Sequence, residues 1–84
     1  SGERVQEKGD AVEKALNRDC AKVLIDLKEV TYMDSMCLSK LLFLDGKARN
    51  LEKHLILSGS NNHVLDLFRD CGLEQVFDLI ESEN

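Results

Sequence analysis

The chain has 84 residues, of which 43% are hydrophobic and 32% are charged, and its formal net charge is -5. This composition is typical of one globular domain and excludes a disordered tail. The acidic balance and the scattered Lys and Arg residues argue against nucleic-acid binding, because phosphate contacts need a basic patch. The longest apolar runs are far too short to span a bilayer, so we expect no direct membrane insertion.

The start of the chain does not resemble a secretory signal. Its first residues are rich in charge and contain no apolar stretch of the kind that such a signal needs. The sequence opens with Ser1 rather than with methionine. We therefore predict a single domain over residues 1–84 and leave open whether it is a truncated fragment.

Cysteine and histidine are too widely spaced for a metal or disulfide framework. Cys20, Cys37 and Cys71 form no CxxC pair, and His54 and His63 complete no metal-ligand spacing. We predict three reduced thiols, as in a cytoplasmic protein, with Cys37 and Cys71 packed as small hydrophobic residues. The sequence indicates no metal and no other cofactor, and both histidines are expected to be partly exposed.

Apolar residues recur with a helical period in some segments and gather in short runs in others. In chain order they predict a helix over 6–18, a strand over 22–27, a helix from 34 or 35 to 50, a strand over 54–58, a helix over 62–71 and a strand over 76–80. The first two strands are apolar runs of the kind found in buried strands. The alternation of helix and strand predicts a parallel sheet with right-handed crossovers.

The second predicted helix has the clearest start signal. Asp34 and Ser35 are both good N-cap residues, and an apolar stripe follows them. We expect Leu38, Leu41, Leu42 and Asp45 to share one face of this helix, with Phe43 and Leu44 widening its apolar surface. Asp45 is also placed to pair with Arg49 one turn later. At the end of the third helix, Gly72 is expected to adopt the left-handed conformation.

Several stretches together resemble the STAS domain family, which includes anti-sigma-factor antagonists and domains of sulfate transporters. The matching stretches are 23–27, 30–35 with Leu38, 64–68, 71–73 and 76–77. At Asp34-Ser35 the family carries Asp-Ser-Ser-Gly-Leu, which opens a helix. The resemblance covers nearly the whole chain. It implies an α/β fold with a small mixed sheet and helices packed on it.

The chain departs from the family pattern at its motif and at its N-terminus. Met36 stands where the family has a second serine, and Cys37 where it has glycine. The family's two N-terminal strands would precede Gly2, and the resemblance places Gly2-Glu3 at the end of the second one. With those strands missing from this chain, it implies an open sheet edge. We expect a partner or a second copy, in a homodimer, to cover that edge.

The resemblance implies a regulatory protein-binding module that is not an enzyme. Family antagonists are switched by phosphorylation of a serine in this motif, and Ser35 is the matching residue. The implied setting is a bacterial, cytoplasmic partner-switching circuit that regulates transcription. In it a serine kinase that is also an anti-sigma factor phosphorylates Ser35, and a PP2C-type phosphatase reverses the step. We expect the partner-binding surface to comprise Asp34, Ser35, Met36 and Ser39.

Three other interpretations stay open. In the first, Asp34 or Ser35 only caps the helix. In the second, the domain is a non-phosphorylated scaffold or a soluble subunit of a membrane transporter, as some STAS domains are. The altered Ser-Met-Cys sequence favours this one. In the third, Cys37 serves as the thiol of an enzyme or a redox sensor, since a thiol in a helix's first turn can have a lowered pKa. Asp34 works against its thiolate, and no histidine stands nearby in sequence as a base.

Overall fold

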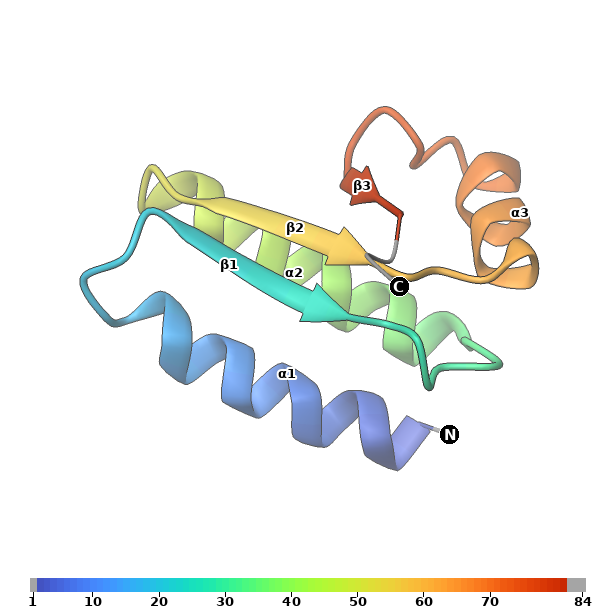
Figure 1. The fold of residues 1–84 in the computed structure, drawn as a ribbon, viewed down its shortest axis with the longest axis horizontal. Coiled ribbons are helices and arrows are strands. Elements are labelled where there is room, and N and C mark those ends of the chain that lie inside the picture. The colour runs from blue at the N-terminus through green and yellow to red at the C-terminus, as the bar shows by residue number, and fades with distance from the viewer. Residues whose placement is uncertain (1, 82–84) are drawn as a thin grey trace.

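The computed structural model describes residues 2–81. Its elements alternate between helix and strand in the predicted order (Figure 1). They are α1 (Gly2–Leu16), β1 (Lys22–Asp26), α2 (Ser35–Asn50), β2 (His54–Ser58), α3 (Asn62–Asp70) and β3 (Asp78–Ile80). The α/β prediction is confirmed. Where the resemblance implied a mixed sheet, the strands described are all parallel, because a segment containing a helix connects each one to the next.

The sheet has the order β1-β2-β3, and α1 and α2 lie side by side against one of its faces (Figure 1). Val23 and Ile25 of β1 are buried, whereas Lys22, Leu24 and Asp26 are exposed. Successive strand residues point to opposite faces, so the exposed set lies on the face away from these helices. The prediction that β1 is buried on both sides is therefore wrong for one face. The apolar run of β1 could not reveal that α1 and α2 pack on the same face of the sheet.

The first helix begins earlier than predicted, and the expectation of a strand end at Gly2-Glu3 is wrong. Glu, Arg, Gln and Lys dominate the residues that follow, and all are strong helix formers. The helix ends at Leu16 rather than at Arg18. At this end the Lys53 ammonium group donates to the carbonyl oxygens of Leu16 and Arg18. A cation there satisfies carbonyls that lack helical partners and complements the helix dipole.

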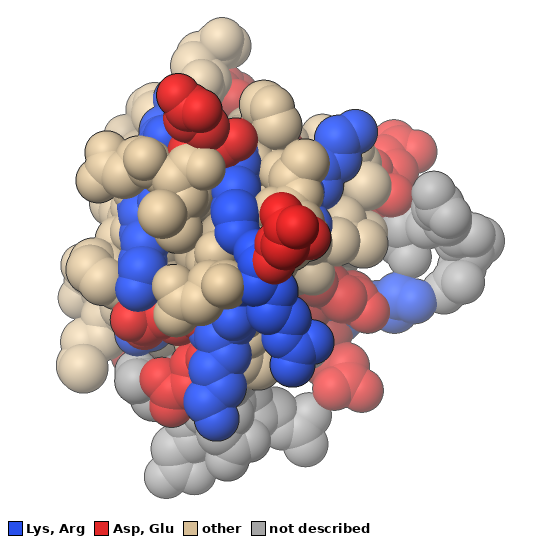
Figure 2. Space-filling model, turned by 90° about the vertical axis from the view of Figure 1, so that its left-hand side faces the viewer, with Lys and Arg blue, Asp and Glu red and all other residues tan. Residues whose placement is uncertain are grey.

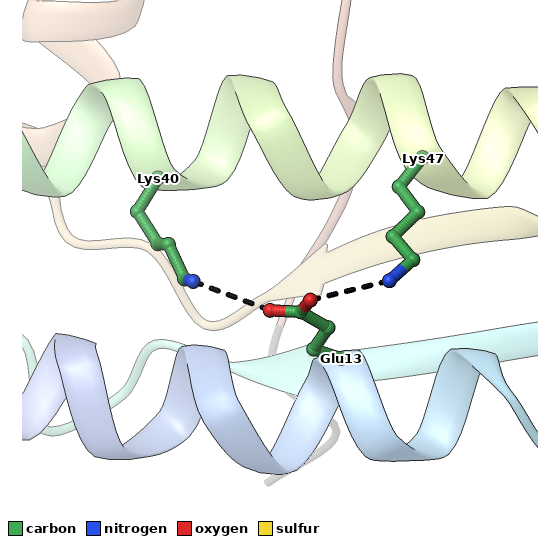
Figure 3. Close-up of polar contacts among 3 residues, drawn as sticks. All are labelled: Glu13, Lys40 and Lys47. Carbon is green, nitrogen blue, oxygen red and sulfur yellow. Dashed lines mark hydrogen bonds and ion pairs between the residues drawn. The ribbon is translucent and has the colours of Figure 1, made fainter.

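A close contact and an ion-pair bridge fix α1 against α2. Gly9 is buried, and a Cβ atom at this position would lie 2.8 Å from the Lys40 side chain, so a larger residue here would displace the end of that lysine. One turn on, Glu13 bridges two lysines of α2 at 3.4 Å for Lys40 and 3.2 Å for Lys47 (Figure 3). The hydrogen bonds from Lys47 and Lys40 lower the pKa of Glu13. These contacts set α1 beside α2 along its length.

The C-terminal segment is attached through an aromatic pair. Phe68 of α3 is fully buried and packs on Phe77, with ring centroids 5.1 Å apart and ring planes tilted by 59°. Gly72 adopts φ of 69°, which confirms the left-handed helix end. The N–H groups of Val76 and Phe77 donate to the carbonyl of Leu73. This turn occupies two residues predicted as strand, so β3 is shorter than expected.

Candidate functional site

The start of α2 is built around a capping aspartate. Asp34 has extended backbone angles, with φ of -94° and ψ of -179°, and its Oδ1 accepts the Cys37 N–H at 2.9 Å. This hydrogen bond is the main cause of the lowered pKa of Asp34. Ser35 is the first residue of the helix. The predicted helix start is confirmed, with Asp34 rather than Ser35 as the cap.

The predicted site residues lie together on the surface. Asp34 is partly buried, whereas Ser35, Met36 and Ser39 are exposed, Met36 to 78%. Ser39 follows Ser35 by four residues, so the two hydroxyl groups share one side of α2 about one turn apart. An accessible serine hydroxyl next to a large exposed thioether gives a surface that a protein partner can contact and an enzyme can modify.

The apolar residues of this helix lie on two different sides of it. Leu42 and Phe43 are 39% and 54% exposed whereas Leu41 and Leu44 are buried, so the prediction of one shared face is wrong. The core side of α2 is formed by Cys37, Leu41, Leu44, Asp45 and Ala48. Phe43 lies near the ammonium group of Lys40, at 5.4 Å from the ring centroid. We refer to the exposed residues Ser35, Met36, Ser39, Leu42 and Phe43 as the α2 face.

The connector between β1 and α2, residues 27–34, is held by buried residues and by a long-range hydrogen bond. Val30 and Met33 are 2% and 4% exposed. The Asn61 Nδ2 donates to the Val30 carbonyl at 3.1 Å, while its Oδ1 accepts the Val64 N–H and caps α3. One asparagine thus ties the connector to the start of α3. Ser35 is presented on an anchored segment, as expected of a site that depends on fixed geometry.

Sequence reasoning missed an aromatic pair beside this connector. Tyr32 is 59% exposed and stacks on His63 of α3, with ring centroids 6.2 Å apart and ring planes at 27°. The two residues are far apart in the sequence, and no periodic pattern links them. The pair extends the surface around Ser35 toward α3. The predicted exposure of His63 and of His54 is confirmed.

The environment of Cys37 disfavours a reactive thiolate. Cys37 is only 4% exposed, and this burial is the main cause of the raised pKa of its thiol. The neighbouring Asp34 carboxylate raises the pKa further. The predicted packing of Cys37 as a small hydrophobic residue is confirmed. The same prediction for Cys71 is wrong, because Cys71 follows the end of α3 and is exposed.

We expect the three thiols to react with iodoacetamide at very different rates at neutral pH. Exposed Cys71 should be alkylated first and partly buried Cys20 more slowly, whereas Cys37 should react only as fast as the fold opens. Peptide mass spectrometry at a series of times measures all three rates in one sample. Alkylation of Cys37 faster than Cys71 below neutral pH would contradict this order and support the thiol-enzyme interpretation.

A separate polar depression of about 460 Å³ lies at the opposite end of α2. Its lining residues are Asp45, Arg49, Glu52, Lys53, His54, Leu55 and Asp78. The predicted pair between Asp45 and Arg49 forms here at 2.8 Å. Figure 2 shows the end of the molecule on the left of Figure 1, and Lys and Arg side chains there are interspersed with Asp and Glu. That face therefore carries side chains of both signs rather than basic residues alone.

Metal-binding and membrane-spanning features were also sought in the described part of the chain. Residues 2–81 contain no group of three or more His, Cys, Asp or Glu side chains placed to hold a metal ion. Within the same residues, no helix has both the length and the hydropathy needed to cross a bilayer. The α2 face, with the connector before it, is the candidate functional site because it presents the exposed Ser35 and Met36 at an anchored helix start.

A family model described as "Mlab, STAS domain" matches residues 3–81. The chain belongs to the STAS domain family. A comparison with curated proteins gave no match. STAS domains are in general binding modules rather than enzymes, and this one is a STAS-type module. In this STAS domain the motif residues Asp34 and Ser35 open α2, as the resemblance implied.

The Asp34 cap of the STAS motif should be visible in the pH dependence of stability. Because the folded-state pKa of Asp34 is lowered, its carboxylate contributes to the free energy of unfolding at neutral pH. This contribution is lost as the pH falls through the lowered pKa. We expect Asp34→Ala to lower the thermal midpoint at pH 7, and the difference from the parent to shrink in strong acid. Thermal unfolding followed by circular dichroism across that pH range measures it.

Asp19→Ala is the matched control for this prediction, since Asp19 is exposed and precedes no helix. Its thermal midpoint should stay near that of the parent at every pH. An Asp34→Ala midpoint equal to the parent value at neutral pH would mean that the cap adds nothing to the stability of α2.

Proposed function

We propose that this STAS domain is a regulatory protein-binding module that acts in the manner of an anti-sigma-factor antagonist. The α2 face is its partner-binding surface, and phosphorylation of Ser35 switches it. One observation carries this proposal. The exposed Ser35 lies between the capping Asp34 and the exposed Met36, at the first position of α2 and directly after a connector held by buried residues. A modifying enzyme can reach its hydroxyl group without unfolding the domain.

The chemistry of a phosphate at Ser35 suits a switch of binding rather than of folding. It adds about -1.5 to -2 charges at pH 7. The Cys37 N–H already has its partner in Asp34, so the phosphate is not needed to complete the cap. Two neighbouring anions on a domain of net charge -5 are strongly disfavoured in a desolvated interface. The unmodified domain therefore binds, and the phosphorylated domain is released.

The partners follow from the family resemblance. A serine kinase that is also an anti-sigma factor would bind the unmodified α2 face, release its sigma factor and phosphorylate Ser35. A PP2C-type phosphatase would restore the hydroxyl group. The ATP belongs to the kinase, so this chain needs no cofactor of its own. This circuit operates in the bacterial cytoplasm.

A constitutive scaffold is the second candidate, and one observation favours it. Met36 is 78% exposed at the position where the family carries its second serine. Together with Phe43, Met36 makes the α2 face more apolar than it would be with serine at position 36, and an apolar surface suits a permanent interface. In this role the domain is a fixed subunit, for example of a membrane transporter, and Ser35 stays unmodified.

Affinity capture combined with phosphate mapping separates the two candidates. The parent chain is used as bait in a cytoplasmic extract of the source cells, ATP is added, and both captured proteins and phosphorylated peptides are identified by mass spectrometry. A captured kinase that phosphorylates the parent and Ser39→Ala, but not Ser35→Ala, supports the phosphorylation switch. A stoichiometric partner that leaves Ser35 unmodified contradicts it and supports the scaffold.

A further inference from the structure

One asparagine joins the two loops that precede α2 and α3. Asn61 is the residue before α3, and both polar atoms of its side-chain amide are used. Its Oδ1 accepts the Val64 N–H at 2.9 Å, which caps α3, and its Nδ2 donates to the Val30 carbonyl at 3.1 Å. These two partners fix the orientation of the amide, because an N–H group can only donate and a carbonyl can only accept.

The cap alone does not require asparagine at position 61. Serine and aspartate cap helices as well as asparagine does, since a cap needs only an oxygen that accepts an N–H. Asparagine adds an amide nitrogen, which is a donor that aspartate lacks, and serine ends one bond short of that nitrogen. Val30 is 2% exposed, and a buried carbonyl that loses its donor is unfavourable. The hydrogen bond to Val30 therefore explains why the capping residue is asparagine.

The segment that Asn61 holds leads directly to the candidate site. Val30 and Tyr32 both precede Ser35 in the connector, and the ring of Tyr32 stacks on His63. Asn61 and His63 both lie at the start of α3. The connector is therefore held by the start of α3, whereas Ser35 is held by its place in α2.

An enzyme bound over Ser35 can also contact the connector, because Thr31 and Tyr32 are exposed. A segment that is already ordered in the free protein costs less entropy to bind than one that must become ordered on contact. A tether on the connector therefore lowers the concentration at which such an enzyme binds the domain. The reactivity of the hydroxyl group does not depend on the tether, because Ser35 belongs to α2.

We propose that Asn61 is a positioning residue for the phosphorylation of Ser35. Its amide keeps the connector in the conformation that the kinase binds, so the start of α3 determines how readily Ser35 is modified. In that step the Ser35 oxygen bonds to the γ-phosphorus of ATP, the bond to the oxygen of ADP breaks, and the kinase takes the hydroxyl proton. This inference rests on the proposed function, since it requires that a kinase uses Ser35.

Two substitutions of Asn61 separate the tether from the cap. In Asn61→Asp the carboxylate still accepts the Val64 N–H, but it has no hydrogen to donate to the Val30 carbonyl. Asn61→Ser also keeps a capping oxygen and removes the amide nitrogen without adding a charge. Asn62→Asp is the matched control for charge, because Asn62 is the exposed first residue of α3. Circular dichroism shows whether each variant is folded.

Hydrogen exchange measures the tether without any partner. The Val30 N–H donates to the Leu27 carbonyl at 3.0 Å, and it should exchange faster in Asn61→Asp and Asn61→Ser than in the parent. The Val64 N–H should exchange at nearly the parent rate, because both variants retain the cap. Equal exchange at Val30 in the parent and both variants would overturn the inference, since the connector would then not depend on the amide.

Phosphorylation kinetics measure the effect on the site. Each chain is incubated at a series of concentrations with ATP and a cytoplasmic extract of the source cells, and mass spectrometry gives the initial rate of phosphate incorporation at Ser35. We expect the apparent KM to rise about tenfold in Asn61→Asp and Asn61→Ser, with little change in the maximal rate. Asn62→Asp should match the parent.

The same kinetics distinguish the two ways of being wrong. Phosphorylation of Ser35 in the parent, with a KM that neither Asn61 variant changes, would overturn the role of Asn61 and leave the proposed function standing. A parent that gains no phosphate at Ser35 would overturn the proposed function and the role of Asn61 with it.

Discussion

Replacing Phe68 with alanine is expected to remove a large share of the stability of the fold. Phe68 is fully buried, and it joins α3 to the C-terminal segment through its tilted contact with Phe77. Truncating such a core phenylalanine typically costs about 3–5 kcal/mol, since it loses buried area and leaves a cavity. Domains of this size are stable by roughly 5–15 kcal/mol in all. Urea unfolding followed by circular dichroism gives the difference in free energy of unfolding.

Phe43→Ala is the matched control, because it makes the same substitution on a side chain that is 54% exposed. Its free energy of unfolding should stay within about 0.5 kcal/mol of the parent value. A large loss in Phe43→Ala, or a small one in Phe68→Ala, would contradict the assignment of Phe43 to the α2 face and of Phe68 to the core. The pair of variants therefore tests which aromatic residues the fold uses and which it leaves for a partner.

The order of the elements and the start of α2 could be predicted because their signals are local. An N-cap such as Asp34 acts within one turn, and the pair of Asp45 with Arg49 also spans one turn. Gly72 ends α3 through its own backbone conformation. In each case the residues that determine the structure stand next to each other in the sequence, so a pattern of a few letters was sufficient.

The two sides of α2 could not be assigned with the same success. Apolar residues occur nearly all round this helix, so placing Leu42 on the same face as Leu41, with Phe43 beside them, was wrong. The spacing of Cys37, Leu41, Leu44 and Ala48, with intervals of three and four residues, was the available signal. Which of two apolar sides faces inward is decided by the position of α1 and the sheet, and that is a tertiary property.

The remaining misses have the same physical origin. β1 is an apolar run whose alternate residue Leu24 faces solvent because α1 and α2 cover one face of the sheet. Tyr32 meets His63 only because the connector and the start of α3 are tied together by Asn61. Contacts of this kind join segments about 30 residues apart in the chain. The sequence predicted the elements, but the surface they form together required their arrangement in space.

That surface and the core share residues of the same motif. Met33 and Cys37 stand two residues to either side of Ser35, and both are buried. Between them, the Asp34 Oδ1 accepts the Cys37 N–H and fixes the first turn of α2. Modification of Ser35 would therefore occur on a helix start that Met33, Asp34 and Cys37 hold in place. In the proposed function, a phosphate at Ser35 would therefore act through surface charge, without a conformational change in the fold.

Ser35→Glu is accordingly expected to weaken partner binding strongly while the domain stays folded. Once the partner has been captured, titration calorimetry should show an affinity lower than that of the parent by at least about a hundredfold. Placing a charge against a like or desolvated surface costs several kcal/mol, and each ~1.4 kcal/mol is a factor of ten. The thermal midpoint should change little, because Asp34 keeps its place as the cap.

Ser39→Glu tests whether this effect belongs to position 35. Both serines are exposed on the α2 face, and both substitutions add one negative charge. A general effect of net charge would weaken binding equally in the two variants, whereas a switch at Ser35 should reduce it far more in Ser35→Glu. Unchanged affinity in Ser35→Glu would contradict the switch and leave the α2 face as a constitutive interface. In that case Met36 is the first residue to replace with alanine, because its side chain is highly exposed. Binding of the partner would then depend on apolar burial rather than on charge.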